Sequence, residues 1–358
     1  MAFLDGFFSL MKELGASDLH LAAGQQPMVR LHGEIERIDH PPFKDDYLKK
    51  VLYEITPELK IKQFEETGDV DFAYALPNVG RFRVNFFNQL RGVGAVFRSI
   101  PSKVLTLDEL GLPQVLKTFC QLEKGMVLVT GPTGSGKSTT LAAMVDYINK
   151  SRKGHILTIE DPIEFVHQPM LCTINHREVG MHTRSFATAL RGALREDPNV
   201  ILVGEMRDLE TISLALEAAA TGHLVFGTLH TQSAAKTIDR IVDVFPPDQQ
   251  EKIRITLSEA LKGVVAQALF KKIGGGRVAA LEILGCNNAV SNLIREAKTF
   301  QITSVMQTQK KLGMRTLDDS IQELLNARYI TPEVAYEKAI NKEIFAKLVK
   351  RQGESLVD

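Results

Sequence analysis

The chain has 358 residues, more than a single hydrophobic core usually organises, and its length therefore predicts two domains. Its 43 lysines and arginines balance its 43 aspartates and glutamates, so no net field gathers a polyanion over the whole chain. The three cysteines are far apart and form no CxxC pair, which argues against a disulfide framework or a cysteine-ligated zinc site and favours a reducing cytoplasm.

Residues 1–15 (MAFLDGFFSLMKELG) are apolar, but they lack a basic start and a small-residue cleavage site and are interrupted by Asp5 and Gly6. They predict an amphipathic helix and not a signal peptide. Nowhere do about 18 apolar residues run together, so no membrane-spanning helix is expected. Residues 1–104 mix short strand patterns with one or two helices, punctuated by glycines, and predict a small α+β domain.

Within that domain, residues 79–99 (VGRFRVNFFNQLRGVGAVFRS) read as half-buried strands that carry four arginines. Side chains alternate across a strand, so Arg81 and Arg83 share one face while the intervening apolar residues share the other. Arg91 and Arg98 follow, and the stretch contains no carboxylate. The arginines therefore face either solvent or a partner outside this stretch.

The segment 100–113 (IPSKVLTLDELGLP) reads as the linker, with a domain boundary near residue 105. Beyond it, apolar strands alternate with helices, which predicts a parallel sheet covered on both faces and an α/β domain over 105–358. From about residue 247 the chain is expected to be mostly helical, interrupted by one strand at 274–284. The predicted strand and helix pairs are 125–131 with 137–150, 155–161 with 185–196, 199–205 with 208–221, and 223–230 with 233–244.

The first of these strands leads into GPTGSGKST, which matches GxxxxGK[ST] between a strand and a helix, the context that this motif requires. Unpaired N–H groups of the loop and the helix dipole favour phosphate, and Lys137 adds a positive charge. The Ser138 hydroxyl is the expected ligand of Mg²⁺. The motif predicts a nucleoside triphosphate site formed by Gly131, Thr133, Gly134, Ser135, Gly136, Lys137, Ser138 and Thr139.

Hydrolysis also requires a group that orients water, and NVILVGEMRD supplies a candidate. A second apolar strand ends here with Gly204 in the usual aspartate position and Glu205 beside it. Glu205 is therefore predicted to orient or deprotonate the attacking water. The alternative is a strand-end carboxylate that pairs with Arg207.

Two further strand ends carry candidate site residues. ILTIEDPIEF places Glu160, Asp161 and Glu164 close together, where their charges repel unless a cation such as that of a magnesium nucleotide is present. The alternative is an exposed acidic turn. His223 and His230 bracket HLVFGTLH and are predicted to be nucleotide sensors or relays, with a purely structural role as the alternative.

These four motifs, in this order and spacing, resemble the secretion ATPases of type II secretion and type IV pili over nearly the whole chain. ASDLHL (16–21) and AVSNLIREAK (289–298) are most similar to the members that retract type IV pili in twitching motility. Ser291 stands where the retraction signature AIRNLIRE has a basic residue. An ordinary amphipathic packing helix is the alternative for that segment.

The resemblance implies a ring-shaped homohexamer in which a PAS-like domain, 1–104, packs against the RecA-like P-loop ATPase domain, 105–358, of its own and a neighbouring subunit. It implies ATP and Mg²⁺ as cofactors and catalytic arginines delivered by the N-terminal domain, for which Arg81 and Arg98 are the best matches. Arg83 and Arg91 are assigned structural or interface roles. It also implies a cytoplasmic motor held at the inner membrane by a pilus platform protein and the pilin machinery.

Alternatives remain open at the level of sequence. A pilus assembly ATPase or an accessory retraction paralogue would share these motifs, although assembly ATPases typically carry an additional N-terminal domain and a four-cysteine zinc site. A RecA-like nucleic-acid translocase would need a basic channel and aromatic platforms, whereas this chain is neutral and has no tryptophan, so no nucleic-acid partner is expected. A third alternative is a scaffold that binds nucleotide but hardly hydrolyses it. Glu205 argues against this alternative, because such a scaffold has no need of a residue that activates water.

Overall fold

The computed structural model describes residues 2–31, 33–100 and 103–353. The chain divides into two compact units. We call the part up to Val104, together with Pro162–Val166, the N-terminal unit, and the remainder the C-terminal unit. No helix among the described residues has the length and apolar character needed to cross a bilayer.

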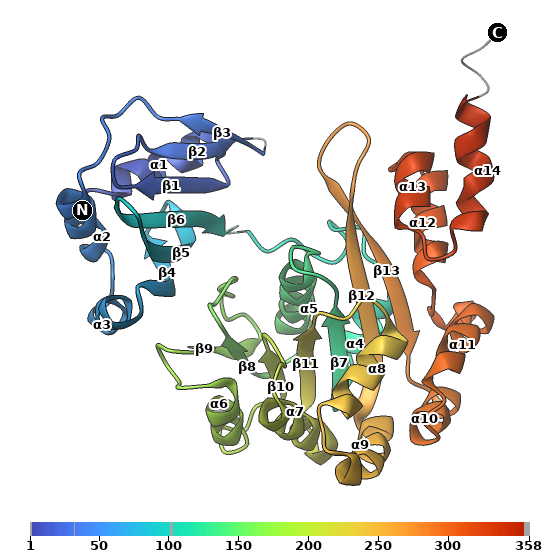
Figure 1. Cartoon of the computed structure of the whole chain (residues 1–358). Helices are drawn as coiled ribbons and strands as arrows, with labels where there is room; N and C mark the ends of the chain where they lie inside the picture. The colour runs from blue at the N-terminus through green and yellow to red at the C-terminus, as the bar shows by residue number, and fades with distance from the viewer. Residues whose placement is uncertain (1, 32, 101–102, 354–358) are drawn as a thin grey trace. The chain divides into compact units, whose positions relative to one another are not determined.

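The N-terminal unit is an antiparallel sheet with helices packed on one face (Figure 1). Its strands follow the order β3-β2-β1-β6-β5-β4. The described part of this unit contains three helices, one more than the upper expectation from sequence. The elements are α1 (Asp5–Leu14), β1 (Asp18–Ala22), β2 (Met28–Leu31), β3 (Glu34–Arg37), α2 (Asp45–Tyr53), α3 (Glu58–Thr67), β4 (Asp69–Leu76), β5 (Gly80–Gln89) and β6 (Gly92–Ile100).

The two faces of this sheet differ as the alternation of residues predicts. Phe82 and Val84 on β5 are buried against the helices, while Arg83 between them is exposed. Arg83 pairs in register with Arg98 on β6, so both arginines lie on the face opposite the core. The antiparallel register thus brings the arginines of β5 and β6 to the same face of the sheet.

The C-terminal unit is built on a mostly parallel sheet in the order β13-β12-β7-β11-β10-β8-β9. Among the described strand pairs of this sheet, only the pair of β12 and β13 is antiparallel. This arrangement confirms the predicted α/β class. The strands are β7 (Gly125–Thr130), β8 (Gly154–Glu160), β9 (Cys172–Glu178), β10 (Val200–Val203), β11 (Leu224–Leu229), β12 (Leu261–Lys271) and β13 (Arg277–Gly285).

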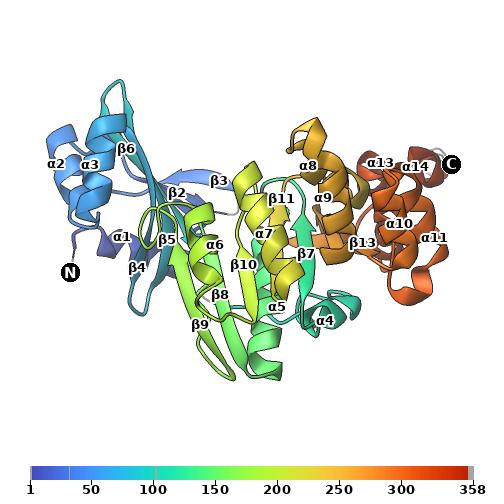
Figure 2. The same cartoon turned by 90° about the horizontal axis from the view of Figure 1, so that it is seen from below.

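Both faces of this sheet are covered by helices (Figure 2). One core includes Leu128 of β7 and side chains of α6 to α9, and the other includes Val127 of β7 and side chains of α4 and α5. Continuous apolar strands follow from burial on both sides. The helices are α4 (Val115–Cys120), α5 (Lys137–Ser151), α6 (Phe186–Ala193), α7 (Leu209–Thr221), α8 (Ala234–Asp243) and α9 (Pro247–Ala260).

The remaining helices lie towards the C-terminus: α10 (Asn288–Arg295), α11 (Ile302–Thr308), α12 (Leu317–Asn326), α13 (Pro332–Lys338) and α14 (Lys342–Gly353). In α10 the Ser291 hydroxyl donates to the Ser258 carbonyl of α9 at 2.8 Å. The position that departs from the retraction signature therefore takes part in packing between these two helices.

The structure corrects one expectation about the elements. The stretch after residue 247 was expected to be mostly helical, but Leu261–Lys271 forms β12 beside the P-loop strand β7. A short apolar run buried on both faces does not distinguish a strand from a helix by periodicity, which explains the error. In the segment predicted as the linker, residues 101 and 102 lie outside the described residues, and Leu107 and Leu112 are buried in a core of the C-terminal unit.

Candidate active site

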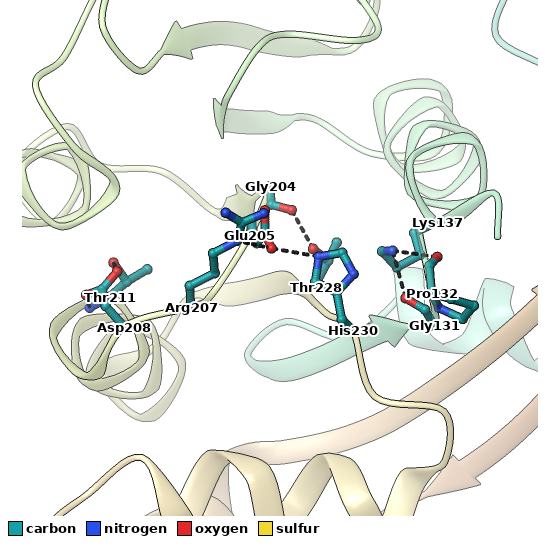
Figure 3. Close-up of polar contacts among 10 residues, drawn as sticks. All are labelled: Gly131, Pro132, Lys137, Gly204, Glu205, Arg207, Asp208, Thr211, Thr228 and His230. Atoms are coloured by element: carbon teal, nitrogen blue, oxygen red, sulfur yellow. Dashed lines mark hydrogen bonds and ion pairs between the residues drawn. The ribbon is translucent and has the colours of Figure 1, made fainter. Parts of the chain in front are cut away.

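Most candidate site residues of the C-terminal unit lie where parallel strands end. β7, β11, β10 and β8 are consecutive neighbours in the sheet, so their carboxyl ends form one edge. The P-loop follows β7 at this edge, His230 follows β11, and Glu205 follows β10 (Figure 3). Ligands of open α/β sheets bind at this kind of edge.

The P-loop backbone leaves its N–H groups available to an anion. Gly136 is the N-cap of α5 with φ +88° and has no side chain that could hydrogen-bond to the first turn. By contrast, α6, α7 and α8 are capped by the side chains of Ser185, Asp208 and Ser233. The first turn of α5 can therefore donate to phosphate.

The predicted phosphate-binding residues lie in the positions that the motif requires. Lys137 begins α5, and its Nζ donates to the carbonyls of Gly131 at 2.8 Å and Pro132 at 3.1 Å (Figure 3). Its ammonium group is therefore held against the loop itself. Of the other predicted residues, Thr133 and Gly134 are exposed, Ser135 is buried, and Ser138 and Thr139 are half-buried in the first turn of α5.

Glu205 accepts hydrogen bonds from two sides. His230 Nε2 donates to Glu205 Oε1 at 2.7 Å, so that nitrogen carries the proton, and Arg207 Nε donates to the same oxygen (Figure 3). This hydrogen bond raises the pKa of Arg207. The pairing with Arg207 that sequence offered as an alternative is therefore present, together with a histidine contact that orients the carboxylate.

The glycine in the usual aspartate position has a local cause. A Cβ on Gly204 would lie 3.1 Å from the Ile159 carbonyl oxygen and 3.2 Å from the Glu160 Cα, because β8 passes close by. Thr228 also donates to the Gly204 carbonyl. Tight packing at this strand end leaves the acidic function to the next residue, Glu205.

The acidic segment is divided between the two units. Glu160 ends β8, and its Oε1 lies 3.8 Å from His176 Nδ1, while Asp161 follows it at the carboxyl edge. Glu164 belongs to the segment that groups with the N-terminal unit. The described residues contain no group of three or more His, Cys, Asp or Glu side chains arranged to hold a metal ion. Glu160, Asp161 and Glu205 therefore supply carboxylate oxygens at this edge, and Ser138 supplies a hydroxyl.

The structure separates the two predicted histidines. His230 follows β11 at the carboxyl edge, but His223 precedes it, and its carbonyl accepts from Gly125 at the start of β7. The His223 ring contacts the Ala218 carbonyl at 3.0 Å. His223 therefore lies at the edge of the sheet opposite the P-loop, because the two ends of a parallel strand lie at opposite edges, and its role as a nucleotide sensor or relay stays a prediction.

Both candidate arginines belong to the N-terminal unit. Arg98 Nε donates to Asp18 Oδ1 at 2.8 Å, and the Asp18 side chain is only 5% exposed. Arg81 donates to the Ile163 carbonyl at 3.4 Å, in the segment that groups with this unit. Each arginine thus has a protein partner within its own unit.

Sequence reasoning missed Gln267, which reaches the P-loop from β12. Its Nε2 donates to the Ser135 carbonyl at 2.7 Å, and its Oε1 accepts from Thr140 Oγ1 at 2.7 Å. The available signal was a polar side chain inside the apolar run VVAQALF. That signal is weak, because the periodicity of a short apolar run does not distinguish a strand from a helix.

Comparison with known proteins places this site among related molecules. Residues 4–275 match the family described as type II/IV secretion system protein. The chain is 58% identical to the type IV pilus retraction ATPase PilT of Pseudomonas aeruginosa, over 92% of this chain and 96% of that protein. It is 37% identical to the type IV pilus ATPase PilU of the same organism, over 98% and 92%. A crystal structure of the pilus retraction motor PilT with bound ADP is 49% identical, has a TM-score of 0.89, and is matched over 96% of this chain and 98% of that one.

Proposed function

The chain belongs to the type II/IV secretion system protein family, and from that premise we propose that it is an ATP-hydrolysing motor that retracts type IV pili. The observation that carries the proposal is the 58% identity, over nearly the full length of both chains, to a protein named as a pilus retraction ATPase. Identity to the pilus ATPase PilU is lower, at 37%. The higher identity to the retraction ATPase favours retraction as the function.

The P-loop binds the phosphates of ATP in this proposal. The first turn of α5 donates backbone N–H groups, and Lys137 exchanges its contacts with the Gly131 and Pro132 carbonyls for phosphate oxygens. Mg²⁺ would neutralise phosphoryl charge, and the Ser138 hydroxyl would hold it, with the Glu160 and Asp161 carboxylates facing the magnesium nucleotide. These residues fit the ion because carboxylate and hydroxyl oxygens are the ligands that it prefers.

Glu205 acts on the water. The His230 hydrogen bond at 2.7 Å fixes the orientation of the carboxylate, which then accepts a proton from the water that attacks the γ-phosphorus. ADP leaves as the new phosphorus–oxygen bond forms, and the proton remains on Glu205 until it passes to solvent. His230 is thus a positioning residue for Glu205.

Charge that develops on the γ-phosphate is neutralised by arginines of the N-terminal unit of a neighbouring subunit in a homohexamer. Two arginines of the C-terminal unit are already engaged by carboxylates, Arg207 by Glu205 and Arg191 by Glu210. Arg81 and Arg98 then close onto the nucleotide, and release after hydrolysis moves the domain. The motor works in the cytoplasm at an inner-membrane platform protein, where it drives pilin removal.

Complementation tests this function directly. Expression of this chain in Pseudomonas aeruginosa that lacks its own PilT should restore twitching while surface pili are still made. Glu205→Gln should not restore twitching and should lower ATP turnover of the purified chain by about 100-fold or more, because the general base is lost while ATP still binds. An assembly ATPase would instead fail to restore twitching and would restore pili to cells that make none. Either that result or wild-type turnover by the glutamine variant would contradict the proposal.

A further inference from the structure

A buried glutamine outside the nucleotide motifs ties the P-loop to the neighbouring strand. We propose that Gln267 of β12 is a positioning residue that sets the phosphate-binding shape of the loop, an inference that rests on the proposed ATPase function. The Gln267 residue is 5% exposed, and its partners Ser135 and Thr140 are 3% and 2% exposed. Water therefore has little access to replace either hydrogen bond.

The two hydrogen bonds use both ends of the Gln267 amide. Nε2 donates to the Ser135 carbonyl and Oε1 accepts from the Thr140 hydroxyl, each at 2.7 Å. A Ser135 carbonyl can only accept, so the orientation of the amide is determined by chemistry. A leucine of similar size could fill the space but would leave both partners without a hydrogen bond from this side chain.

The peptide that follows Ser135 explains why this contact matters for phosphate. In a trans peptide the carbonyl and the next N–H point in opposite directions. When Gln267 holds the Ser135 carbonyl towards the core, the Gly136 N–H points away from the core, towards the open side of the loop. Thr140 lies in the first turn of α5 one turn beyond Gly136, so the same glutamine also holds the helix whose N-terminus faces the phosphates.

Two glycines of the motif pack directly against Gln267. A Cβ on Gly131 would lie 2.2 Å from the Gln267 carbonyl oxygen, and a Cβ on Gly136 would lie 2.8 Å from Gln267 Nε2. Both glycines also have positive φ values, +140° and +88°. The loop is therefore pressed onto β12 at two points, and its glycines are needed for this approach as well as for phosphate.

The test compares full-length Gln267→Leu with wild type in steady-state MgATP hydrolysis and in ADP binding. We expect kcat/KM to fall by about 10- to 100-fold, and ADP to bind at least about tenfold more weakly, because the loop is no longer held in its binding geometry. The matched control is Gln250→Leu. It removes an amide that donates to the Phe245 carbonyl at 3.0 Å, away from the P-loop, and should leave both measurements within about twofold of wild type.

A second pair of variants tests the same contact if Gln267→Leu does not fold. Thr140→Val removes the hydroxyl that donates a hydrogen bond to Gln267 and should weaken ADP binding. Thr140→Ser keeps a hydroxyl at this position and should bind ADP as wild type does. Wild-type ADP affinity and kcat/KM in Gln267→Leu, or in Thr140→Val when Gln267→Leu cannot be purified, would overturn the proposal. So would an equal loss in Gln250→Leu. If the wild-type chain hydrolyses no ATP, the proposed function fails, while ADP binding still decides the role of Gln267.

Discussion

Glu282 of β13 is a carboxylate buried among helix termini. It is 3% exposed, and its Oε1 accepts from the Ala234 N–H at the start of α8 at 2.7 Å. Burial raises the pKa of Glu282, although hydrogen bonds from the backbone of Ala234 and Leu317 oppose this effect. The residue therefore joins α8, which follows the His230 loop, to α12 at the cost of burying a charge.

The pH dependence of stability should report this burial. A carboxyl group whose pKa is higher in the folded state than its ordinary value of 4.5 contributes stability below pH 4.5, and that contribution is lost as the pH rises through the folded pKa. Wild type should therefore lose stability relative to Glu282→Gln as pH rises from 4.5, by about 1.4 kcal/mol for each unit that separates the two pKa values. Urea unfolding of both proteins across this pH range measures the difference.

The control for this prediction is Glu251→Gln, because Glu251 is exposed on α9. Its stability should follow that of wild type at every pH. A stability difference between wild type and Glu282→Gln that stays constant with pH would contradict the prediction.

At the scale of elements, α1, predicted from residues 1–15, packs on the sheet through the ring of Phe8. Phe8 of α1 is fully buried, stacks on Phe82 of β5 with ring centroids 4.4 Å apart, and meets Phe97 of β6 at 5.1 Å. Aromatic pairs at these separations stabilise beyond the area that they bury. The amphipathic helix α1 is thus stabilised by packing its apolar side on the apolar face of the sheet.

Phe8→Ala should lower the free energy of unfolding of the N-terminal unit by about 3–5 kcal/mol, because a large cavity replaces the ring. Hydrogen exchange of the full chain would show the loss as faster exchange in β1, β5 and β6, while β7 and β10 in the other unit exchange at their wild-type rates. Phe3→Ala is the control, since Phe3 is 40% exposed and its removal should cost no more than about 1 kcal/mol. Equal effects of the two variants would show that α1 packs less specifically than the structure indicates.

At the scale of the whole molecule, the proposed function requires a second copy of the chain to complete the site. The P-loop and Glu205 belong to one unit and Arg81 and Arg98 to the other. In the proposed ring, each chain would therefore contribute one half of the site at each of two interfaces. Arg98 must leave Asp18, which holds it at 2.8 Å, to act on a nucleotide. Nucleotide binding would then be coupled to the arrangement of the ring.

Mixing two inactive variants tests this arrangement. A chain with Arg81→Ala and Arg98→Ala, mixed with Glu205→Gln, should recover ATP hydrolysis at least about tenfold above either variant alone, since some interfaces then combine an intact Glu205 with intact arginines. The measurement requires that subunits exchange, shown with differently labelled chains. No recovery in confirmed mixed rings would contradict the prediction. It would mean either that the arginines act in the site of their own chain or that one inactive site stops hydrolysis in the whole ring.

The sequence by itself determined the α/β class, the P-loop between β7 and α5, the apolar strand that precedes Glu205, and the alternation of the arginine-bearing strand. These features depend on residue order over short distances, where periodicity and motif spacing are sufficient. The tertiary structure alone decided that β12 is a strand beside β7, that His223 and His230 lie at opposite edges, and that Gln267 holds the P-loop. Gln267 and Thr140 are 127 positions apart in the chain. Such contacts are set by strand order and register in the folded sheet. Local sequence patterns contain no information about either.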